Sequence, residues 1–201
     1  FANEEDKGVF TRECDAWVNL GLHPNIVSCY YVRRIGGVPA IFSEWMDGGS
    51  LEDAIQSGSL YTGSKAKQKE RILDTAIQFA RGLHYADEAG LIHQDVKPAN
   101  VMMTIDGTAR ITDFGLAKAR PATSETELAE PGRSLVVSTG GMTPAYCSPE
   151  QANGQPLTRR TDVWSWAVSV LEMLVGEVRW RGGPVAAEVL KNLSNYGGEE
   201  V

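Results

Sequence analysis

The spacing of apolar residues along the chain predicts three long helices. In each of them apolar side chains fall near one face of a helix. The predicted helices cover about residues 4–20, 67–89 and 160–175. Their apolar faces are formed by Phe10, Trp17 and Leu20 in the first helix, by Ile72, Leu73, Ala76, Ile77, Ala80 and Leu83 in the second, and by Trp164, Val168, Leu171 and Val175 in the third.

Shorter apolar runs predict strands between these helices. Two of the runs, residues 26–34 and 38–44, flank the pair Gly36-Gly37, which suits a hairpin turn. Residues 91–112 again contain short strand-like runs, with Asp106-Gly107 as a second hairpin turn. The chain therefore alternates helix-like and strand-like segments.

Glycine, proline and serine residues mark the ends of several predicted helices. Gly21 and Pro24 end the first helix, and Gly90 is a C-terminal stop for the second. Ser50 suits the N-cap of a short helix that begins at the next residue, with Asp53 near its positive end.

Two further segments carry no regular pattern. Residues 119–132 are rich in Pro, Ala, Thr, Ser and Glu, so we expect a mobile loop there. The sequence after Gly182 is weakly patterned, and we predict no element in it.

Composition and charge narrow the class of protein. Hydrophobic residues make up 42% of the 201 positions and charged residues 22%, which is ordinary for a globular protein with a sizeable core. The formal net charge of -7 argues against a general nucleic-acid or anionic-membrane binder. The apolar run from Trp164 to Val175 is too short and too often interrupted to span a membrane.

The three cysteines do not suggest a metal site or a disulfide framework. Cys14, Cys29 and Cys147 are scattered, and no pair of them has metal-ligand spacing. Free thiols in a reducing cytosol are the simplest interpretation.

Three short motifs in a fixed order carry the chemistry of the chain. The first is HQDVKPAN, from His93 to Asn100, and the second is Asp113-Phe114-Gly115. The third is Ser148-Pro149-Glu150. This ordered set resembles the signatures H-R-D-x-x-x-x-N, D-F-G and A-P-E of the protein kinase family. The chain looks like a eukaryotic-like (Hanks-type) serine/threonine protein kinase, and the run around Tyr146 is most similar to bacterial members.

The residue types in these motifs suit phosphoryl transfer, which depends on positioning and charge neutralisation. Mg²⁺ prefers oxygen ligands, which the carboxylate of Asp113 and the amide of Asn100 can supply. Asp95 suits the task of orienting a substrate hydroxyl and accepting its proton. Lys97 can place a positive charge on the transferred phosphoryl group. The implied cofactors are ATP and Mg²⁺, or Mn²⁺ in its place.

The resemblance implies a nucleotide site at the hinge between two lobes. The backbone groups of Glu44 and Met46 would bond the adenine edge, and Ser43 would be a small gatekeeper. Met102 resembles the residue that forms the floor beneath the adenine. Asn100, Asp113 and Lys97 would complete the nucleotide site.

Further residues have structural or regulatory roles by the same resemblance. Glu13 resembles the helix-C glutamate, His93 and Phe114 are packing residues, and Gly115 ends the D-F-G motif. Residues 143–150 resemble the loop that docks the peptide substrate, and we call them the docking segment. Its Thr143 would bond the catalytic loop and Glu150 is its glutamate, whereas Asp162 would brace the loop backbone.

The resemblance implies an α+β, protein-kinase-like fold in two partial domains. Residues 1–46 would form a truncated N-lobe, with helix C, part of an antiparallel sheet and the hinge. Residues 47–201 would form a mainly helical, C-terminally truncated C-lobe. The glycine-rich loop and the ATP-contacting lysine would both precede Glu13, and neither is found there. We therefore expect weak nucleotide binding and little turnover from this chain alone.

Gln94 stands where the family has an arginine that neutralises an activation-loop phosphate. Our hypothesis is that activity does not depend on phosphorylation of that loop. Alanine substitution of every hydroxyl residue from Thr123 to Thr139 tests it, because a loss of activity would contradict the hypothesis.

The expected function is transfer of the ATP γ-phosphate to Ser or Thr hydroxyls of protein substrates. Lys97 is the residue that favours serine/threonine over tyrosine specificity in the family. The main alternative is a pseudokinase, a binding module without phosphoryl transfer. A small-molecule kinase of the aminoglycoside or choline type shares the two aspartates but lacks the Ser148-Pro149-Glu150 segment. We expect a cytoplasmic location, with no nucleic-acid or membrane contact within these residues, and the oligomeric state stays open.

Overall fold

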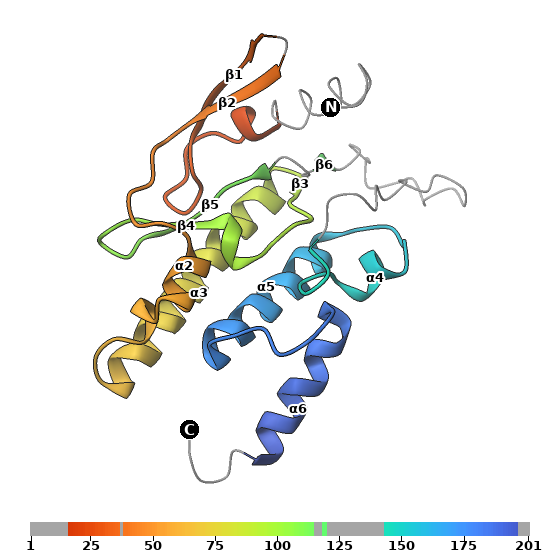
Figure 1. Ribbon diagram of the computed structural model, residues 1–201. Coiled ribbons are helices and arrows are strands. Elements are labelled where there is room, and N and C mark those ends of the chain that lie inside the picture. The colour runs from red at the N-terminus through yellow and green to blue at the C-terminus, as the bar shows by residue number, and fades with distance from the viewer. Residues whose placement is uncertain (1–15, 37, 115–117, 120–142, 197–201) are drawn as a thin grey trace.

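The computed structural model of the protein describes residues 16–36, 38–114, 118–119 and 143–196 (Figure 1). The strands are β1 (Cys29–Ile35), β2 (Val38–Ser43), β3 (Leu91–Ile92), β4 (Val101–Met103), β5 (Ala109–Ile111) and β6 (Lys118–Ala119). The helices are α2 (Leu51–Gln56), α3 (Lys65–Glu88), α4 (Pro149–Ala152), α5 (Arg159–Val175) and α6 (Ala186–Tyr196), and the 3-10 helices are η1 (Ser59–Tyr61), η2 (Pro98–Asn100) and η4 (Gly183–Val185).

Small antiparallel sheets and long helices confirm the expected α+β class. Among the described residues the strands form two-stranded sheets, in which β1 pairs with β2, β3 with β6, and β4 with β5. Figure 1 shows the β1–β2 hairpin at one end of the molecule and α6 at the other, with α3 and α5 between them.

The first predicted helix is described only at its end. Residues 16–19 are helical, and the rest of the predicted range 4–20 lies outside the described residues. Trp17 and Leu20 are both buried, as their place on an apolar face predicts. The Trp17 indole Nε1 donates to the Val27 carbonyl at 2.9 Å, which fixes the helix end against the chain that leads into β1.

The predicted strand over residues 26–34 starts three residues too early. Ile26 and Val27 precede β1 and lie in the core, where Ile26 forms an isolated bridge to Ile111. The Val27 N–H donates to the Ile111 carbonyl at 2.8 Å. Ile26 and Val27 therefore attach the hairpin to β5 instead of extending β1. Strand β2 ends at Ser43, one residue before the predicted limit.

Helix α2 begins where Ser50 predicted it. The Ser50 hydroxyl accepts from the Asp53 N–H at 3.1 Å, and the Asp53 carboxylate accepts from the Ser50 N–H at 2.8 Å. This reciprocal capping box satisfies two of the groups that an isolated helix end leaves unpaired.

Helices α3 and α5 pack against each other and carry the C-terminal part of the core. Only one of the two apolar rows predicted on α3 faces inward: Ile72 and Ala76 are buried, whereas Leu73 and Ile77 are 53% and 50% exposed. The Trp166 indole Nε1 of α5 donates to the Ala76 carbonyl of α3 at 3.1 Å, which fixes the pairing of the two helices.

The predicted apolar face of α5 packs in a second, smaller cluster. Its buried members are Tyr146, Val168, Leu171, Trp180 and Ala186, with Trp164 and Val175 packed against them.

The C-terminal helix α6 was not predicted from the sequence. It follows the turn at Gly183, where an added Cβ would collide with the backbone of Cys147. Glycine is therefore required at that close approach. Most of the predicted mobile loop over residues 119–132 lies outside the described residues, and Ala119 itself belongs to β6.

Candidate active site

The HQDVKPAN segment forms the loop between β3 and β4. Leu91 and Ile92 of β3 are buried, so the chain enters the loop from the core. Pro98 opens the 3-10 helix that returns the chain to β4, a position where the missing N–H of proline costs nothing. The loop between these two buried anchors presents Asp95, Lys97 and Asn100.

Asp95 is the centre of a polar cluster. Its Oδ2 accepts from the Lys97 Nζ at 2.6 Å and from the Asn100 Nδ2 at 3.2 Å. Its Oδ1 accepts from the N–H of Thr143 at 3.2 Å and from the Thr143 hydroxyl at 3.0 Å. Lys97 also donates to the Thr143 hydroxyl, at 2.7 Å. The cluster brings together the predicted base, the predicted phosphate-binding lysine and the predicted loop-bonding threonine.

Asn100 and Asp113 are tied together through the backbone. The N–H of Thr112 donates to the Asn100 carbonyl at 2.9 Å, which holds the residue before Asp113 beside the loop. Asp113 is exposed, and its φ of 61° is in the left-handed region that non-glycine residues seldom adopt. Such a strained residue persists only where its surroundings fix it, which is common at functional sites.

Asp162, at the start of α5, holds the backbone of the loop. Its Oδ2 accepts from the His93 N–H at 2.8 Å and its Oδ1 from the Gln94 N–H at 2.9 Å. Gln94 has a φ of 72°. The first two peptide groups of the loop are thus held by one buried carboxylate.

An aromatic stack connects the loop to the N-terminal helix. Phe114 is fully buried, and its ring centroid lies 4.7 Å from that of His93 and 5.9 Å from that of Trp17. The His93 Nε2 hydrogen-bonds the Thr112 carbonyl at 3.0 Å. His93 and Phe114 thus pack against each other, and Trp17, which the sequence indicated only as an apolar helix residue, packs against Phe114.

The predicted hinge lies beside β4. The Met103 N–H donates to the Gly49 carbonyl at 2.8 Å, and the Gly48 N–H donates to the Met103 carbonyl at 3.0 Å. Gly48 has no room for a Cβ at this crossing. Ser50 forms an isolated bridge to Met102, so the predicted adenine floor adjoins the predicted hinge.

The Glu44 side chain anchors the start of the hinge to β5. Its Oε1 accepts from the Arg110 Nη1 of β5 at 2.6 Å. The Glu44 N–H donates to the Ser28 carbonyl at 2.9 Å, and Met46 is buried. The backbone N–H of Glu44 is thus already bonded within the protein.

The segment from Thr143 to Ala152 closes over the loop. Glu150 Oε1 accepts from the Thr161 hydroxyl at 2.9 Å, which joins α4 to α5. The Tyr146 hydroxyl donates to Glu172 Oε2 at 2.6 Å in the buried interior. Burial raises the pKa of Glu172, while the bond from Tyr146 partly opposes that rise.

Two groups of this segment are held in their protonated form by burial. Burial raises the pKa of the Tyr146 phenol well above its ordinary value, and the hydrogen bond to Glu172 raises it further. Burial also raises the pKa of the Cys147 thiol, so this cysteine lacks the thiolate character of a reactive one.

Sequence reasoning did not identify Glu172 or Gln151 as parts of the site. Glu172 gave a signal, since it follows Leu171 and shares a helix face with Val168, an uncommon place for a carboxylate. Gln151 gave none beyond its place next to Glu150. Glu13 and Gly115 lie outside the described residues.

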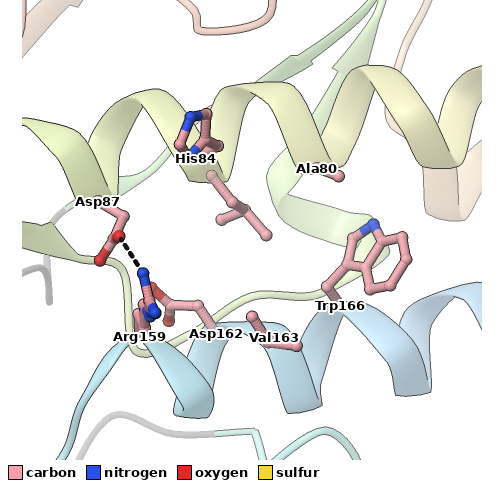
Figure 2. Close-up of a pocket in the computed structure, with 8 residues that line it drawn as sticks. Ala80, His84, Asp87, Arg159, Asp162, Val163 and Trp166 are labelled. Atoms are coloured by element: carbon pink, nitrogen blue, oxygen red, sulfur yellow. Dashed lines mark ion pairs between the residues drawn. The ribbon is translucent and has the colours of Figure 1, made fainter.

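A separate cavity of about 290 Å³ lies between α3 and α5 on the far side of the brace. Figure 2 shows Ala80, His84 and Asp87 of α3 facing Val163 and Trp166 of α5. The Asp87 and Arg159 side chains, which line this cavity, form an ion pair of 3.8 Å. Asp162 lines this cavity, but Asp95 does not, so the cavity is distinct from the site of the three motifs.

Asn100 and Asp113 are the candidate ligands for a metal ion. Asn100 directs its amide nitrogen to the Asp95 carbonyl at 2.8 Å, which leaves its amide oxygen as the atom able to bind a cation. No described group of three or more His, Cys, Asp or Glu side chains could enclose a metal. An amide oxygen and an exposed carboxylate fit Mg²⁺, which keeps several waters and takes substrate phosphates as its other ligands.

The chain matches a profile of the protein kinase domain over residues 2–197. This match covers nearly the whole sequence and agrees with the order of the three motifs, the braced loop and the hinge. The chain belongs to the protein kinase domain family.

Three bacterial proteins are among the relatives of the chain. A probable serine/threonine-protein kinase of Clostridium acetobutylicum is 33% identical over 195 residues, which are 96% of this chain and 27% of that relative. The probable kinase PknB of Lactococcus lactis is 31% identical over 183 residues, 91% of this chain and 27% of its own length. PknJ of Mycobacterium tuberculosis is 32% identical over 184 residues, 89% of this chain and 28% of its own. The chain thus spans about a quarter of the length of these relatives.

None of the helices that the structure describes has the length and apolar character needed to cross a membrane.

Proposed function

We propose that this chain is part of the catalytic domain of a protein serine/threonine kinase. The observation that carries the proposal is the cluster in which Asp95, Lys97 and Thr143 are joined by direct hydrogen bonds. In this cluster Asp95 is the candidate base, Lys97 is the cation for the phosphoryl group, and Thr143 belongs to the docking segment. Membership of the family and the names of the bacterial relatives support the same activity.

The proposed reaction starts with a Ser or Thr hydroxyl of a protein substrate taking the position of a donor to Asp95. Asp95 accepts the hydroxyl proton as the oxygen forms a bond to the γ-phosphorus of ATP, and the bond from that phosphorus to the bridging oxygen breaks. Lys97 offsets the negative charge on the transferred group. The products are a phosphorylated protein and ADP.

Asn100 and Asp113 would hold Mg²⁺. When bound, the ion neutralises the charge of the ATP phosphates. The protein's own contribution is to fix these two ligands, because Asn100 is held by Asp95 and Asp113 follows the residue that bonds the Asn100 backbone. The hinge from Glu44 to Met46, with Met102 beneath it, would hold the adenine.

The experiment is phosphate transfer by the full-length protein to peptides that contain only Ser and Thr or only Tyr as hydroxyl residues. We expect Mg²⁺-dependent transfer to Ser and Thr. Asp95→Asn should lower kcat by about 10²- to 10⁴-fold, because general-base catalysis is worth that much. Asp74→Asn, the same change at an exposed site on α3, is the control and should leave kcat unaltered.

The alternative is a pseudokinase that binds nucleotide without transferring phosphate. Thermal unfolding with and without Mg·ATP separates the two, since a ligand that binds the folded state raises its stability. A shift that Asp113→Ala removes, without any transfer to peptides, would favour the pseudokinase. Transfer abolished by Asp95→Asn would exclude it.

We further propose that the domain works in the cytoplasm on protein substrates. Two of its cysteines, Cys29 and Cys147, are free thiols in the structure, which suits a reducing compartment where ATP is available. Fractionation of cells expressing the tagged full-length protein tests the location.

A further inference from the structure

The side chain of Gln151 lies between the docking segment and the catalytic loop. It is 3% exposed. Its Nε2 donates to the Gln94 carbonyl at 2.7 Å, and its Oε1 accepts from the Ser148 N–H at 2.9 Å. One amide group therefore connects the N-terminus of α4 to the loop that carries Asp95.

The carbonyl that Gln151 contacts belongs to the peptide group joining Gln94 to Asp95. The N–H of the same peptide group donates to the His93 Nδ1 at 3.3 Å. This peptide plane is thus held on both sides, by Gln151 from α4 and by His93 from the loop itself. Its orientation sets the direction in which the Asp95 side chain leaves the backbone.

Gln94 needs such support because of its backbone conformation. Its φ of 72° is unfavourable for a residue with a side chain. The Asp162 carboxylate holds the N–H of Gln94, and Gln151 holds its carbonyl. Without the second contact the peptide plane before Asp95 could rotate while the brace from α5 stayed in place.

We propose that Gln151 is a positioning residue for the catalytic base Asp95, and that through it the docking segment sets the geometry of the base. The inference rests on the proposed kinase function. Thr143, earlier in the same segment, contacts Asp95 directly, so the segment reaches the base from its side chain and from its backbone. A segment displaced from this position would leave Asp95 misaligned even with nucleotide bound.

Glutamine is the residue that supplies both contacts. Gln151→Glu keeps an acceptor for the Ser148 N–H but loses the donor to Gln94. Gln151→Met keeps the length and apolar stem without either polar group. Gln68→Glu is a matched control, because the Gln68 Nε2 donates to the backbone carbonyl of Gly63 at 2.9 Å on the exposed start of α3.

The first measurement is steady-state kinetics of the full-length variants on a Ser/Thr peptide. For Gln151→Glu and Gln151→Met we expect kcat to fall about 10- to 100-fold, the size that misplacement of a reacting group produces. KM for ATP and the Mg·ATP-induced thermal shift should stay within about twofold of the native protein, and Gln68→Glu should match the native protein throughout. Unaltered kcat in both Gln151 variants, or a loss shared equally by kcat and ATP binding, would overturn the inference.

The second measurement is amide hydrogen exchange, which needs no activity. In both variants exchange should become faster in a peptide covering residues 91–97, and stay unchanged in peptides from α3. Exchange unchanged over residues 91–97, or faster throughout the protein, would contradict the positioning role. A native protein that transfers no phosphate would defeat the proposed function, whereas the exchange result would still decide whether Gln151 holds the loop.

Discussion

Glu172 shows how a single buried carboxyl group in this protein makes stability depend on pH. It lies on α5, is 5% exposed and accepts a hydrogen bond from the Tyr146 hydroxyl. Burial raises its pKa above the ordinary value of 4.5, so the folded protein holds this proton more tightly than the unfolded chain does. Its contribution to stability is therefore greatest below pH 4.5 and falls as the pH rises through the raised pKa.

Glu172→Gln should remove that pH-dependent loss. The glutamine is neutral at every pH, and its side-chain oxygen can still accept from Tyr146. We expect the free energy of unfolding of the variant to exceed that of the native protein by a margin that grows from pH 4.5 upward. Urea unfolding at a series of pH values measures the difference, and a margin that does not vary with pH would contradict the assigned cause.

At the residue scale the sequence indicated which candidate residues lie together, but not the residues that support them. Asp95, Lys97 and Asn100 are a few positions apart in a dense motif, and a short loop can only bring them together. Gln151 and Glu172 act through contacts 57 and 26 positions away in the chain. Such long-range partners depend on the packing of α4 and α5, which local patterns do not encode.

At the scale of elements, helices were predicted most accurately where a capping residue or a regular apolar spacing marked them in the sequence. Ser50 and the apolar rows of α3 and α5 located three helices within two residues, because caps and periodicity act over one or two turns. Ile26 and Val27 read as strand, but the backbone there bonds the end of β5 instead. Helix α6 was missed, although Ala186, Val189 and Leu193 recur at helical spacing in the sequence.

Thr158 caps the helix that carries the brace, and this gives a prediction about α5. Its hydroxyl accepts from the Arg160 N–H at 3.3 Å, and its carbonyl accepts from the Thr161 N–H at 2.9 Å. Thr158→Ala should lower the free energy of unfolding by about 0.5–2 kcal/mol, because the first turn loses an acceptor. Denaturant titration measures the loss. Thr158→Ser keeps the hydroxyl and should remain close to the native protein, whereas equal losses in both variants would argue against a capping role.

At the scale of the whole molecule, the stack of Trp17, Phe114 and His93 holds together three segments that are far apart in sequence. Phe114→Ala should cost about 3–5 kcal/mol, because it opens a cavity where the native side chain has no exposed surface. That is a large share of the roughly 5–15 kcal/mol that stabilise a typical domain.

Two measurements test the stack: the size of the stability loss, and the regions in which hydrogen exchange becomes faster. Chemical denaturation should show the loss for Phe114→Ala and a smaller one for Phe114→Leu, which refills part of the cavity. Hydrogen exchange should rise both at residues 16–20 and in the loop after β3, since both border the cavity. A change confined to one of the two regions would mean that the stack does not couple them.

The Asp95 carboxylate has a further consequence for the molecule as a whole. Four protein donors, two from Thr143 and one each from Lys97 and Asn100, occupy the roughly four acceptor positions of an ionised carboxylate. Thr143→Val removes one of these donors. We therefore expect the variant to hydrolyse more ATP per phosphate transferred to a peptide, which a coupled ADP assay beside a transfer assay measures. An unchanged ratio would show that the donors do not exclude solvent.

In the native protein a water molecule that binds the Asp95 carboxylate competes with these four protein donors. In the proposed mechanism a substrate hydroxyl takes the place of one of these donors. On that proposal, the contacts that shape the loop also limit the hydrolysis of ATP by water before a substrate binds.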